Sequence, residues 1–307
     1  MADDLILHHH DPSPFAEKIR KAFGIKRLAW QSVQIPMAMP KPDLTCLTGG
    51  YRGTPVLQIG ADIYCDTRLI IDVIERRAPT PPLFRSGQLA NFGLQNWSDD
   101  AVFPPGAALA MHENADNLPG GLIKERQQYF ANLDFDRFAI DAPHFRAQFR
   151  AQAALVEAQL SDGRDFLFGS APEWADINAF FPIWMARGHF PSAERLLEGM
   201  TRLAAWRDRM DEFGTGARTD LSAEDALAVA RRATPSGIGP DTGRLDESGA
   251  QPGDAVTVFP VEHPETAVAG RLEAAGDTEI IISRAHERTG DVAIHFPRIG
   301  YRINPST

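Results

Sequence analysis

The residues best suited to chemistry begin at Ser13, whose hydroxyl follows a short apolar run and precedes an amphipathic segment. The apolar run at residues 5–7 predicts a strand. Ser13 is a favourable helix N-cap, and Pro14 suits the first helical position. The apolar face of the following helix repeats every four residues: Phe15, Ile19 and Phe23. Backbone N–H groups converge at such a strand-to-helix junction, so we expect Ser13 to lie where an anionic group binds.

The first 82 residues predict an α/β domain that holds this junction. Predicted strands and helices alternate along it: strands over residues 27–34, 54–59 and 63–64, helices over 43–47 and 68–77. Asp66 and Thr67 are expected to cap the second of these helices. The proline-rich run at 78–82 is stiff and predicts the end of a domain spanning residues 1–82.

Four dipeptides occur in order along this framework: Ser13-Pro14, Lys41-Pro42, Thr54-Pro55 and Asp66-Thr67. The ordered set resembles the glutathione S-transferase family, and the order of elements is similar to the thioredoxin-like half of those proteins. The opening is most similar to the omega-like pattern Cys-Pro-Phe-Ala-Glu-Arg-x-Arg, with Ser13 standing where that class has cysteine. The resemblance spans residues 1–215.

The resemblance implies that glutathione is the co-substrate and that Ser13 stabilises its thiolate by donating a hydrogen bond. A lower thiol pKa increases the population of the nucleophilic form. Serine cannot form a mixed disulfide, so thiol transfer and reductase chemistry are disfavoured, whereas conjugation, isomerisation or peroxide reduction are favoured. Phe15, two residues after Ser13, is expected to line the same site.

The same resemblance implies the remaining contacts with glutathione. Thr54, before a cis Pro55, is expected to offer its backbone to the cysteinyl part. Asp66 and Thr67 are expected to receive the γ-glutamyl group, because a carboxylate pairs with an ammonium and a helix N-terminus receives a carboxylate. Lys41 is expected to meet the glycyl carboxylate. Taken singly, Asp66-Thr67 is usually a helix cap, Thr54-Pro55 is normally a strand start and Lys41 is normally a solvated lysine; only the ordered set favours glutathione.

Residues 86–233 predict an all-helical domain like the C-terminal half of the family. The predicted helices are numerous: 88–103, 107–112, 120–132, 143–160, 174–188, 196–213 and 222–234. Pro104-Pro105 is expected to interrupt the first of them. The resemblance implies a hydroxyl cap three residues before Asp176, where Glu173 stands instead, so Ser170 or backbone contacts are expected to substitute.

An electrophile pocket is also implied by the resemblance. Its candidate lining residues are His10, Trp97, Phe103 and Met111. Packing in the core is the alternative for the aromatic residues, because aromatic side chains at helical spacing usually point inward.

Beyond a linker at residues 234–253, rich in Gly, Pro, Ser and Asp, the pattern changes to short strands. They are predicted at 255–259, 267–274, 279–283, 292–296 and 301–303. Together they indicate a small β-rich barrel or sheet domain over residues 254–307, which the family resemblance does not reach. We expect this segment to pack on the helical domain or at a subunit interface, with recognition of a partner or ligand as the alternative.

The composition argues against several classes of function. A net charge of −10 and a pI near 5.4 disfavour nucleic acid or an anionic membrane as partner. Neither a signal peptide nor the roughly 20 apolar residues of a membrane span are expected. Cys46 and Cys65 form no disulfide framework or zinc motif and do not occupy the nucleophile's place, so a cytoplasmic protein without a metal is expected. The triplet His8, His9 and His10 is expected to end the first strand rather than bind a metal.

Three kinds of protein fit these features. The first is a transferase that adds glutathione to a small electrophile, the second a glutathione-dependent isomerase or dehalogenase, and the third a non-catalytic glutathione-binding module whose β-rich segment recruits a partner. The resemblance also implies a homodimer with a role in detoxification. Tyr51, four residues before Pro55, stands where some classes insert an aromatic ring into the partner subunit; a surface loop is the alternative.

Overall fold

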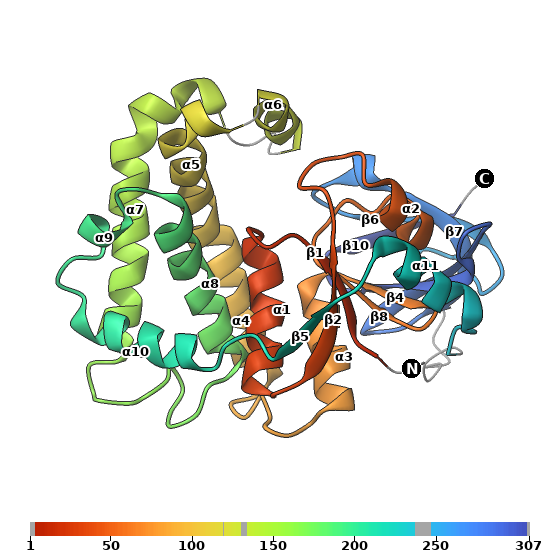
Figure 1. Ribbon diagram of the computed structural model, residues 1–307, viewed down its shortest axis with the longest axis horizontal. Coiled ribbons are helices and arrows are strands. Elements are labelled where there is room, and N and C mark those ends of the chain that lie inside the picture. The colour runs from red at the N-terminus through yellow and green to blue at the C-terminus, as the bar shows by residue number, and fades with distance from the viewer. Residues whose placement is uncertain (1–3, 119, 130–133, 237–246, 306–307) are drawn as a thin grey trace. The chain divides into compact units, whose positions relative to one another are not determined.

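The computed structural model describes most of the chain: residues 4–118, 120–129, 134–236 and 247–305 (Figure 1). The chain divides into two compact units. The first, here the sheet unit, is built from three separate segments: Met1–Ile19, Leu28–Arg77 and Ala217–Thr307. The second, here the helical unit, comprises Arg20–Arg27 and Ala78–Gly216. The chain therefore returns to its first unit after completing the second.

The N-terminal elements follow the predicted order: β1 (Ile6–His9), α1 (Pro14–Ile25), β2 (Ala29–Gln34), α2 (Pro42–Thr48), β3 (Val56–Ile59), β4 (Asp62–Cys65) and α3 (Thr67–Arg77). Strand β2 runs parallel to β1, whereas β3 is antiparallel to β1 and β4 is antiparallel to β3. The resulting order β4-β3-β1-β2 confirms the predicted thioredoxin-like arrangement.

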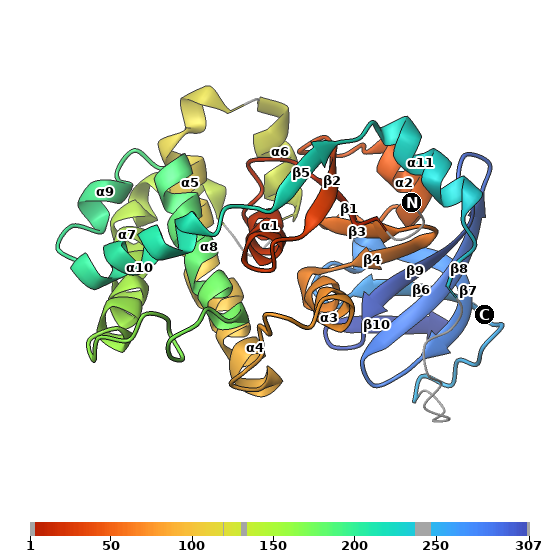
Figure 2. The same cartoon turned by 60° about the horizontal axis from the view of Figure 1, so that its bottom comes forward.

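The C-terminal strands extend this same sheet: β6 (Ala255–Pro260), β7 (Val268–Ala275), β8 (Glu279–His286), β9 (Gly290–Pro297) and β10 (Tyr301–Pro305). A short 3-10 helix, Pro264–Thr266, lies between β6 and β7. Strands β6 to β9 are antiparallel neighbours, and β10 pairs antiparallel with β6. Strand β9 lies parallel to β4, so one ten-stranded sheet results in the order β10-β6-β7-β8-β9-β4-β3-β1-β2-β5 (Figure 2).

The β-rich segment is therefore confirmed as a sheet, but its place differs from the expectation. It belongs to the sheet unit and shares one buried core with it, to which Ile63 of β4 and Ile294 of β9 both contribute. These two residues are also partners in the β4–β9 register. Without β9, the edge of β4 would present unpaired backbone N–H and C=O groups, which is why the strand is covered. The predicted linker 234–253 lies partly outside the described residues.

Two further elements join the sheet unit although the sequence placed their residues in the helical domain. Strand β5 (Ala217–Asp220) pairs parallel with β2, and α11 (Ala223–Arg232) contacts α2, β2 and β9. The apolar face of α11 is buried, with Leu227 only 1% exposed. Ser222 caps α11, since its Oγ accepts the N–H of Asp225 at 3.0 Å. Helices α2 and α11 cover one face of the sheet, and α3 covers the other (Figure 2).

The helical unit confirms the predicted all-α class: α4 (Gln88–Trp97), a π-helix (Ser98–Val102), α5 (Phe103–Glu113), α6 (Gly120–Tyr129), α7 (Phe138–Gln159), α8 (Trp174–His189), α9 (Ala193–Leu196) and α10 (Thr201–Glu212), with 3-10 turns at Ala115–Asn117 and Phe135–Arg137. The predicted interruption at Pro104-Pro105 is wrong. Both prolines stand in the first turn of α5, where a missing N–H costs little, and the π-helical turn connects α4 to α5. In the part of the chain that the structure describes, no helix has the length and apolarity to cross a membrane.

The start of α8 is capped differently from the prediction, which had Ser170 or backbone contacts as the substitute. Glu173 itself takes the capping role in a reciprocal capping box: its side chain accepts the backbone N–H of Asp176, and Asp176 Oδ2 accepts the N–H of Glu173 at 3.0 Å. The Glu173 carboxylate reaches back to the start of α4, where it accepts the N–H of Ser86 and the Nδ2 of Asn91, both at 2.9 Å. A carboxylate can accept several hydrogen bonds at once, and a serine hydroxyl could not bridge the same groups.

Candidate functional site

One end of the sheet unit brings the predicted residues together. The register pairs His8 of β1 with Val56 of β3, and Val56 with Cys65 of β4. The turn after β1, the loop before β3 and the residue after β4 therefore leave the sheet at the same end. These three segments carry Ser13, the Thr54-Pro55 pair and the Asp66-Thr67 pair.

Ser13 caps α1 as predicted. Its Oγ accepts the backbone N–H of Ala16 at 3.2 Å, and its own N–H donates to the His10 carbonyl at 3.0 Å. Since Oγ is the acceptor in the first of these bonds, that bond leaves the hydroxyl hydrogen unused. Ser13 is only 4% exposed and lies at a helix N-terminus, whose partial positive charge favours an anion. Phe15 is half-buried, and the Nζ of Lys18 lies 4.7 Å from its ring centroid.

Lys41 and Thr54 are in direct contact. The Nζ of Lys41 donates to Thr54 Oγ1 at 2.8 Å and to the carbonyl of Arg52 at 3.2 Å. Lys41 is 4% exposed, so its ammonium is held against the loop rather than extended into water. The Thr54–Pro55 bond is cis, as the resemblance implied. The lysine thus anchors the loop that presents the backbone of Thr54.

Asp66 and Thr67 form the start of α3. Asp66 adopts a left-handed backbone with φ +74°, a conformation that aspartate tolerates better than most residues. Its Oδ1 accepts the N–H of Arg68 at 2.9 Å, and its carbonyl accepts the N–H of Ile70 at 2.9 Å. Thr67 is buried. The acidic side chain, the hydroxyl and the helix N-terminus are therefore next to one another, as the γ-glutamyl interpretation requires.

Tyr301 of β10 also reaches this cluster, although no pattern in the sequence marks it as a site residue. Its Oη donates to Asp66 Oδ2 at 3.2 Å and lies 3.0 Å from the Oη of Tyr51. Tyr51 is 7% exposed, and its ring packs edge-on against Phe296 of β9, 6.0 Å between centroids. The expectation that Tyr51 inserts into a partner subunit is therefore wrong, because this ring is buried in its own chain.

The histidine triplet ends β1, as expected, and each of its members is buried. The Nε2 of His8 lies 2.8 Å from Gln58 Oε1, and the Nε2 of His9 lies 3.0 Å from Ser32 Oγ. His10 contributes the carbonyl that receives the N–H of Ser13. Among the described residues, no group of three or more His, Cys, Asp or Glu side chains is placed to hold a metal ion.

The two cysteines are free thiols in the core. Burial, together with the nearby charge of Asp66, raises the pKa of the Cys65 thiol well above its usual value, so the thiolate is disfavoured. The Sγ of Cys46 donates to the carbonyl of Pro42 at 3.3 Å within α2. These environments agree with the expectation that neither cysteine acts as a nucleophile.

The aromatic candidates for an electrophile pocket lie in the helical unit. The Trp97 indole N–H donates to Gln152 Oε1 at 2.9 Å, which connects α4 to α7. The Phe103 ring lies 6.0 Å from that of Phe181 in α8. Both contacts fit side chains that pack helices together, and both residues are half-buried.

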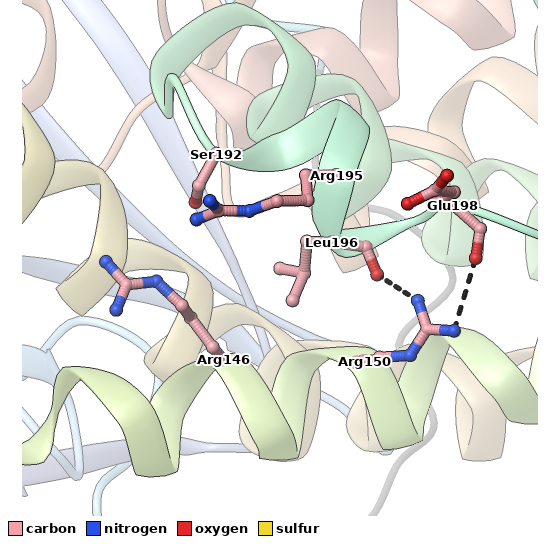
Figure 3. Close-up of a pocket in the computed structure, with 6 residues that line it drawn as sticks. All are labelled: Arg146, Arg150, Ser192, Arg195, Leu196 and Glu198. Atoms are coloured by element: carbon pink, nitrogen blue, oxygen red, sulfur yellow. Dashed lines mark hydrogen bonds between the residues drawn. The ribbon is translucent and has the colours of Figure 1, made fainter.

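A cavity of about 360 Å³ in the helical unit has a cationic lining: Arg146, Arg150, Ser192, Arg195, Leu196 and Glu198 (Figure 3). Two of these arginines, Arg146 and Arg150, already form hydrogen bonds with other groups of the protein. The Nη2 of Arg146 lies 2.8 Å from Glu113 Oε1, and Arg150 donates to the carbonyls of Leu196 and Glu198. These bonds connect α7 to neighbouring segments, so the cavity offers weaker support for a binding site than the end of the sheet does.

Comparison with known proteins identifies both halves of this arrangement. Residues 7–82 match the glutathione S-transferase N-terminal domain, and residues 124–209 match the glutathione S-transferase C-terminal domain. No curated protein matches the sequence. The chain is 37% identical to a GST-like protein from Pseudomonas syringae of known structure, with a TM-score of 0.82, and the match covers 100% of both chains. That protein therefore matches the C-terminal strands as well.

Two more distant structures share the fold. A glutathione S-transferase from Rhodospirillum rubrum F11 is 20% identical over 67% of this chain and 87% of that chain, with a TM-score of 0.51. FzlA from C. crescentus is 20% identical over 73% of this chain and 92% of that chain, also with a TM-score of 0.51.

Proposed function

Because the chain belongs to the glutathione S-transferase family, we propose that it binds glutathione at the Ser13 end of its sheet and transfers it to a small electrophile. The observation that carries this proposal is the convergence of Ser13, Thr54 and Asp66 at that one end. Each group is of the type that one part of glutathione requires: a donor for the thiolate, a backbone for the cysteinyl part and a carboxylate for the ammonium.

In the proposed mechanism, the Ser13 hydroxyl donates a hydrogen bond to the glutathione sulfur. A hydrogen bond to the thiolate favours that form over the thiol, as does the N-terminus of α1. The thiol proton is released to water, and the thiolate sulfur then forms a bond to the electrophilic carbon. In a substitution the leaving group departs with the electron pair of its bond to that carbon, and in an addition the product takes up a proton from water. The Ser13 hydroxyl keeps its own proton throughout. Serine forms no mixed disulfide, so the proposal favours conjugation, isomerisation or peroxide reduction over thiol transfer and reductase chemistry.

The other parts of glutathione are proposed to bind the neighbouring residues at the same end of the sheet. Asp66 accepts the γ-glutamyl ammonium, and Thr67 with the first amides of α3 receives its carboxylate. Lys41 holds the Thr54 loop through the 2.8 Å bond and supplies positive charge toward the glycyl carboxylate. Phe15 and His10, in the sheet unit, are proposed for the surroundings of the sulfur. Trp97 and Phe103, in the helical unit, stay candidates for contact with the electrophile.

The setting of this chemistry is proposed to be the cytoplasm, because both cysteines are free thiols and glutathione is a cytosolic reductant. A homodimer is proposed from family membership alone, since Tyr51 is not available to a partner. The β-rich segment shares the core of the sheet unit, so we do not propose it as a separate recruiting module.

The test is isothermal titration with glutathione, followed by turnover assays on a panel of aryl halides, epoxides and unsaturated acids. Ser13→Ala should reduce turnover by about 10- to 100-fold, the value of a hydrogen bond to a charged group, while changing glutathione affinity far less. Ser13→Thr retains both the cap and the hydroxyl and serves as the matched control. Its turnover should stay within a few-fold of wild type.

Three outcomes contradict the proposal or part of it. Equal turnover by wild type and Ser13→Ala would show that the hydroxyl does not stabilise the thiolate. Absence of binding at millimolar glutathione would remove the transferase and the isomerase interpretations together. Tight binding with no turnover on any electrophile would instead favour the non-catalytic module.

A further inference from the structure

The C-terminal strand β10 places a phenol directly on the acidic residue of the proposed site. The Tyr301 Oη lies 3.2 Å from Asp66 Oδ2 and 3.0 Å from the Tyr51 Oη. Asp66 and Tyr301 are 235 positions apart in the sequence, and both belong to the sheet unit. The family resemblance ends before the C-terminal strands. One of these strands, β10, nevertheless contributes a side chain to the proposed glutathione site.

The direction of these hydrogen bonds follows from counting hydrogens. A carboxylate can only accept hydrogen bonds, so the hydroxyl of Tyr301 must donate its single hydrogen to Asp66. Tyr301 can then only accept from Tyr51, which gives a chain from Tyr51 through Tyr301 to Asp66. Burial, with the neighbouring Tyr51 and Asp66, raises the pKa of Tyr301 well above its usual value, so this donor keeps its proton.

Each carboxylate oxygen of Asp66 therefore accepts one hydrogen bond from the protein. Oδ1 accepts the N–H of Arg68 at 2.9 Å, and Oδ2 accepts from Tyr301. A carboxylate has about four lone-pair positions, so each oxygen retains capacity for an ammonium ligand. The two existing bonds fix the plane of the carboxylate before the ligand arrives, which reduces the ordering cost of binding.

The two tyrosines are buried and packed against the same neighbour. Tyr301 is 9% exposed, is paired with Pro260 of β6 and has its ring centroid 5.6 Å from that of Phe296. Tyr51 is 7% exposed and packs against the same phenylalanine. A side chain at Gly53 would collide with the Tyr51 hydroxyl, so the loop that leads to Thr54 is shaped around this ring.

We propose that Tyr301 is a positioning residue of the glutathione site, orienting the Asp66 carboxylate toward the γ-glutamyl ammonium, with Tyr51 supporting it. This inference rests on the proposed function and extends it, because it makes the C-terminal strands part of the ligand site. It also specifies the ligand chemistry involved: the effect of Tyr301 is exerted on an α-ammonium group and on no other part of glutathione.

The experiment is a titration of the full chain with glutathione and with an analogue that lacks the γ-glutamyl α-amino group. Tyr301→Phe should weaken glutathione binding by about 3- to 10-fold, the effect of one hydrogen bond, and leave binding of the analogue unchanged. Asp66→Asn should weaken glutathione binding by roughly 10-fold or more, because it removes the charge that pairs with the ammonium. In the Asp66→Asn background, Tyr301→Phe should have almost no further effect.

Tyr64→Phe is the matched control, since it removes a tyrosine hydroxyl from β4, where the ring stacks on His295 instead. It should leave both affinities unchanged. If Tyr301→Phe fails to fold, Tyr51→Phe tests the same chain of hydrogen bonds and should weaken glutathione binding in the same direction, by a smaller factor.

The outcomes separate this inference from the function on which it rests. If wild type does not bind glutathione, the proposed function fails and takes the inference with it. If wild type binds but Tyr301→Phe binds equally well, or loses affinity for glutathione and the analogue alike, only the positioning role is overturned. Additive losses for Tyr301→Phe and Asp66→Asn would overturn it too.

Discussion

Two buried histidines, one in each half of the long sheet, are held in opposite ways. His8 of β1 faces an amide, with its Nε2 2.8 Å from Gln58 Oε1. Burial lowers its pKa from 6.5 to about 4, so the ring is neutral. His295 of β9 faces two carboxylates, with Nε2 3.1 Å from Asp62 and Nδ1 3.5 Å from Glu279. Burial opposes its charge, yet these two partners raise its pKa above the usual value.

The difference shows how the two halves are joined. The N-terminal half has a neutral polar interior around His8, where Gln58 also donates to the carbonyl of Ala226 in α11 at 2.9 Å. The junction of β4 with β9 carries a charged cluster in addition to its backbone pairing, because Asp62 lies on β4 while His295 and Glu279 come from the C-terminal strands. Tyr64 of β4 stacks on His295 at 4.4 Å between centroids.

The largest expected effect tests the charged junction. His295→Ala would leave the Asp62 and Glu279 carboxylates buried without their cation, and breaking a buried pair in this way costs about 3 to 5 kcal/mol in unfolding free energy. The measurement is urea denaturation at pH 7. His263→Ala is the control in the same half, because the Glu265 partner of His263 has a 59% exposed side chain and such pairs contribute little. Similar losses in the two variants would contradict a charged junction.

A smaller change in unfolding free energy is expected with pH, and the two histidines should contribute to it with opposite signs. His8 is neutral in the folded state down to about pH 4 but is protonated below 6.5 when unfolded. The unfolded state therefore binds more protons in this window, so stability falls as the pH drops, by on the order of 3 kcal/mol for this residue. The pKa of His295 is raised instead, so its contribution is present below the unfolded value of 6.5 and is lost as pH rises through the folded value.

His8→Gln retains a donor toward Gln58 but does not titrate, which makes it the variant for this prediction. Its unfolding free energy, measured from pH 7 to pH 4, should decline less steeply than that of wild type. An unchanged acid slope would show that His8 is not the neutral buried group inferred here.

The smallest effect is expected at Arg288, in the turn between β8 and β9. Its guanidinium lies 2.8 Å from Asp43 of α2 and 2.7 Å from Glu224 of α11, whose side chain is 77% exposed. Water and salt screen such pairs, so Arg288→Gln should shift the urea midpoint hardly at all. A loss as large as that of His295→Ala would mean that surface pairs, and not the buried cluster, hold the C-terminal strands in place.

Local patterns were sufficient for most of the elements and for the helix starts that carry Ser13 and Asp66. The cap at Ser13 and the start of α3 at Asp66 depend on contacts between residues close in sequence, and alternation with turn residues marks the five C-terminal strands whatever their partners are. The cis Thr54–Pro55 bond was predicted from the family resemblance and is present in the structure. The resemblance also supplied the glutathione interpretation, which stays a proposal.

What only the tertiary structure decided involves residues far apart in the chain. Three such contacts are the pairing of β9 with β4, the packing of α11 on the sheet and the hydrogen bond from Tyr301 to Asp66. The periodicity of the sequence does not predict them, because any strand edge or apolar face could satisfy the same local pattern. The choice among such partners is made by burial and by satisfaction of backbone and polar groups across the whole fold. For that reason the sequence could place Ser13 in a site, while the fold alone could add Tyr301 to it.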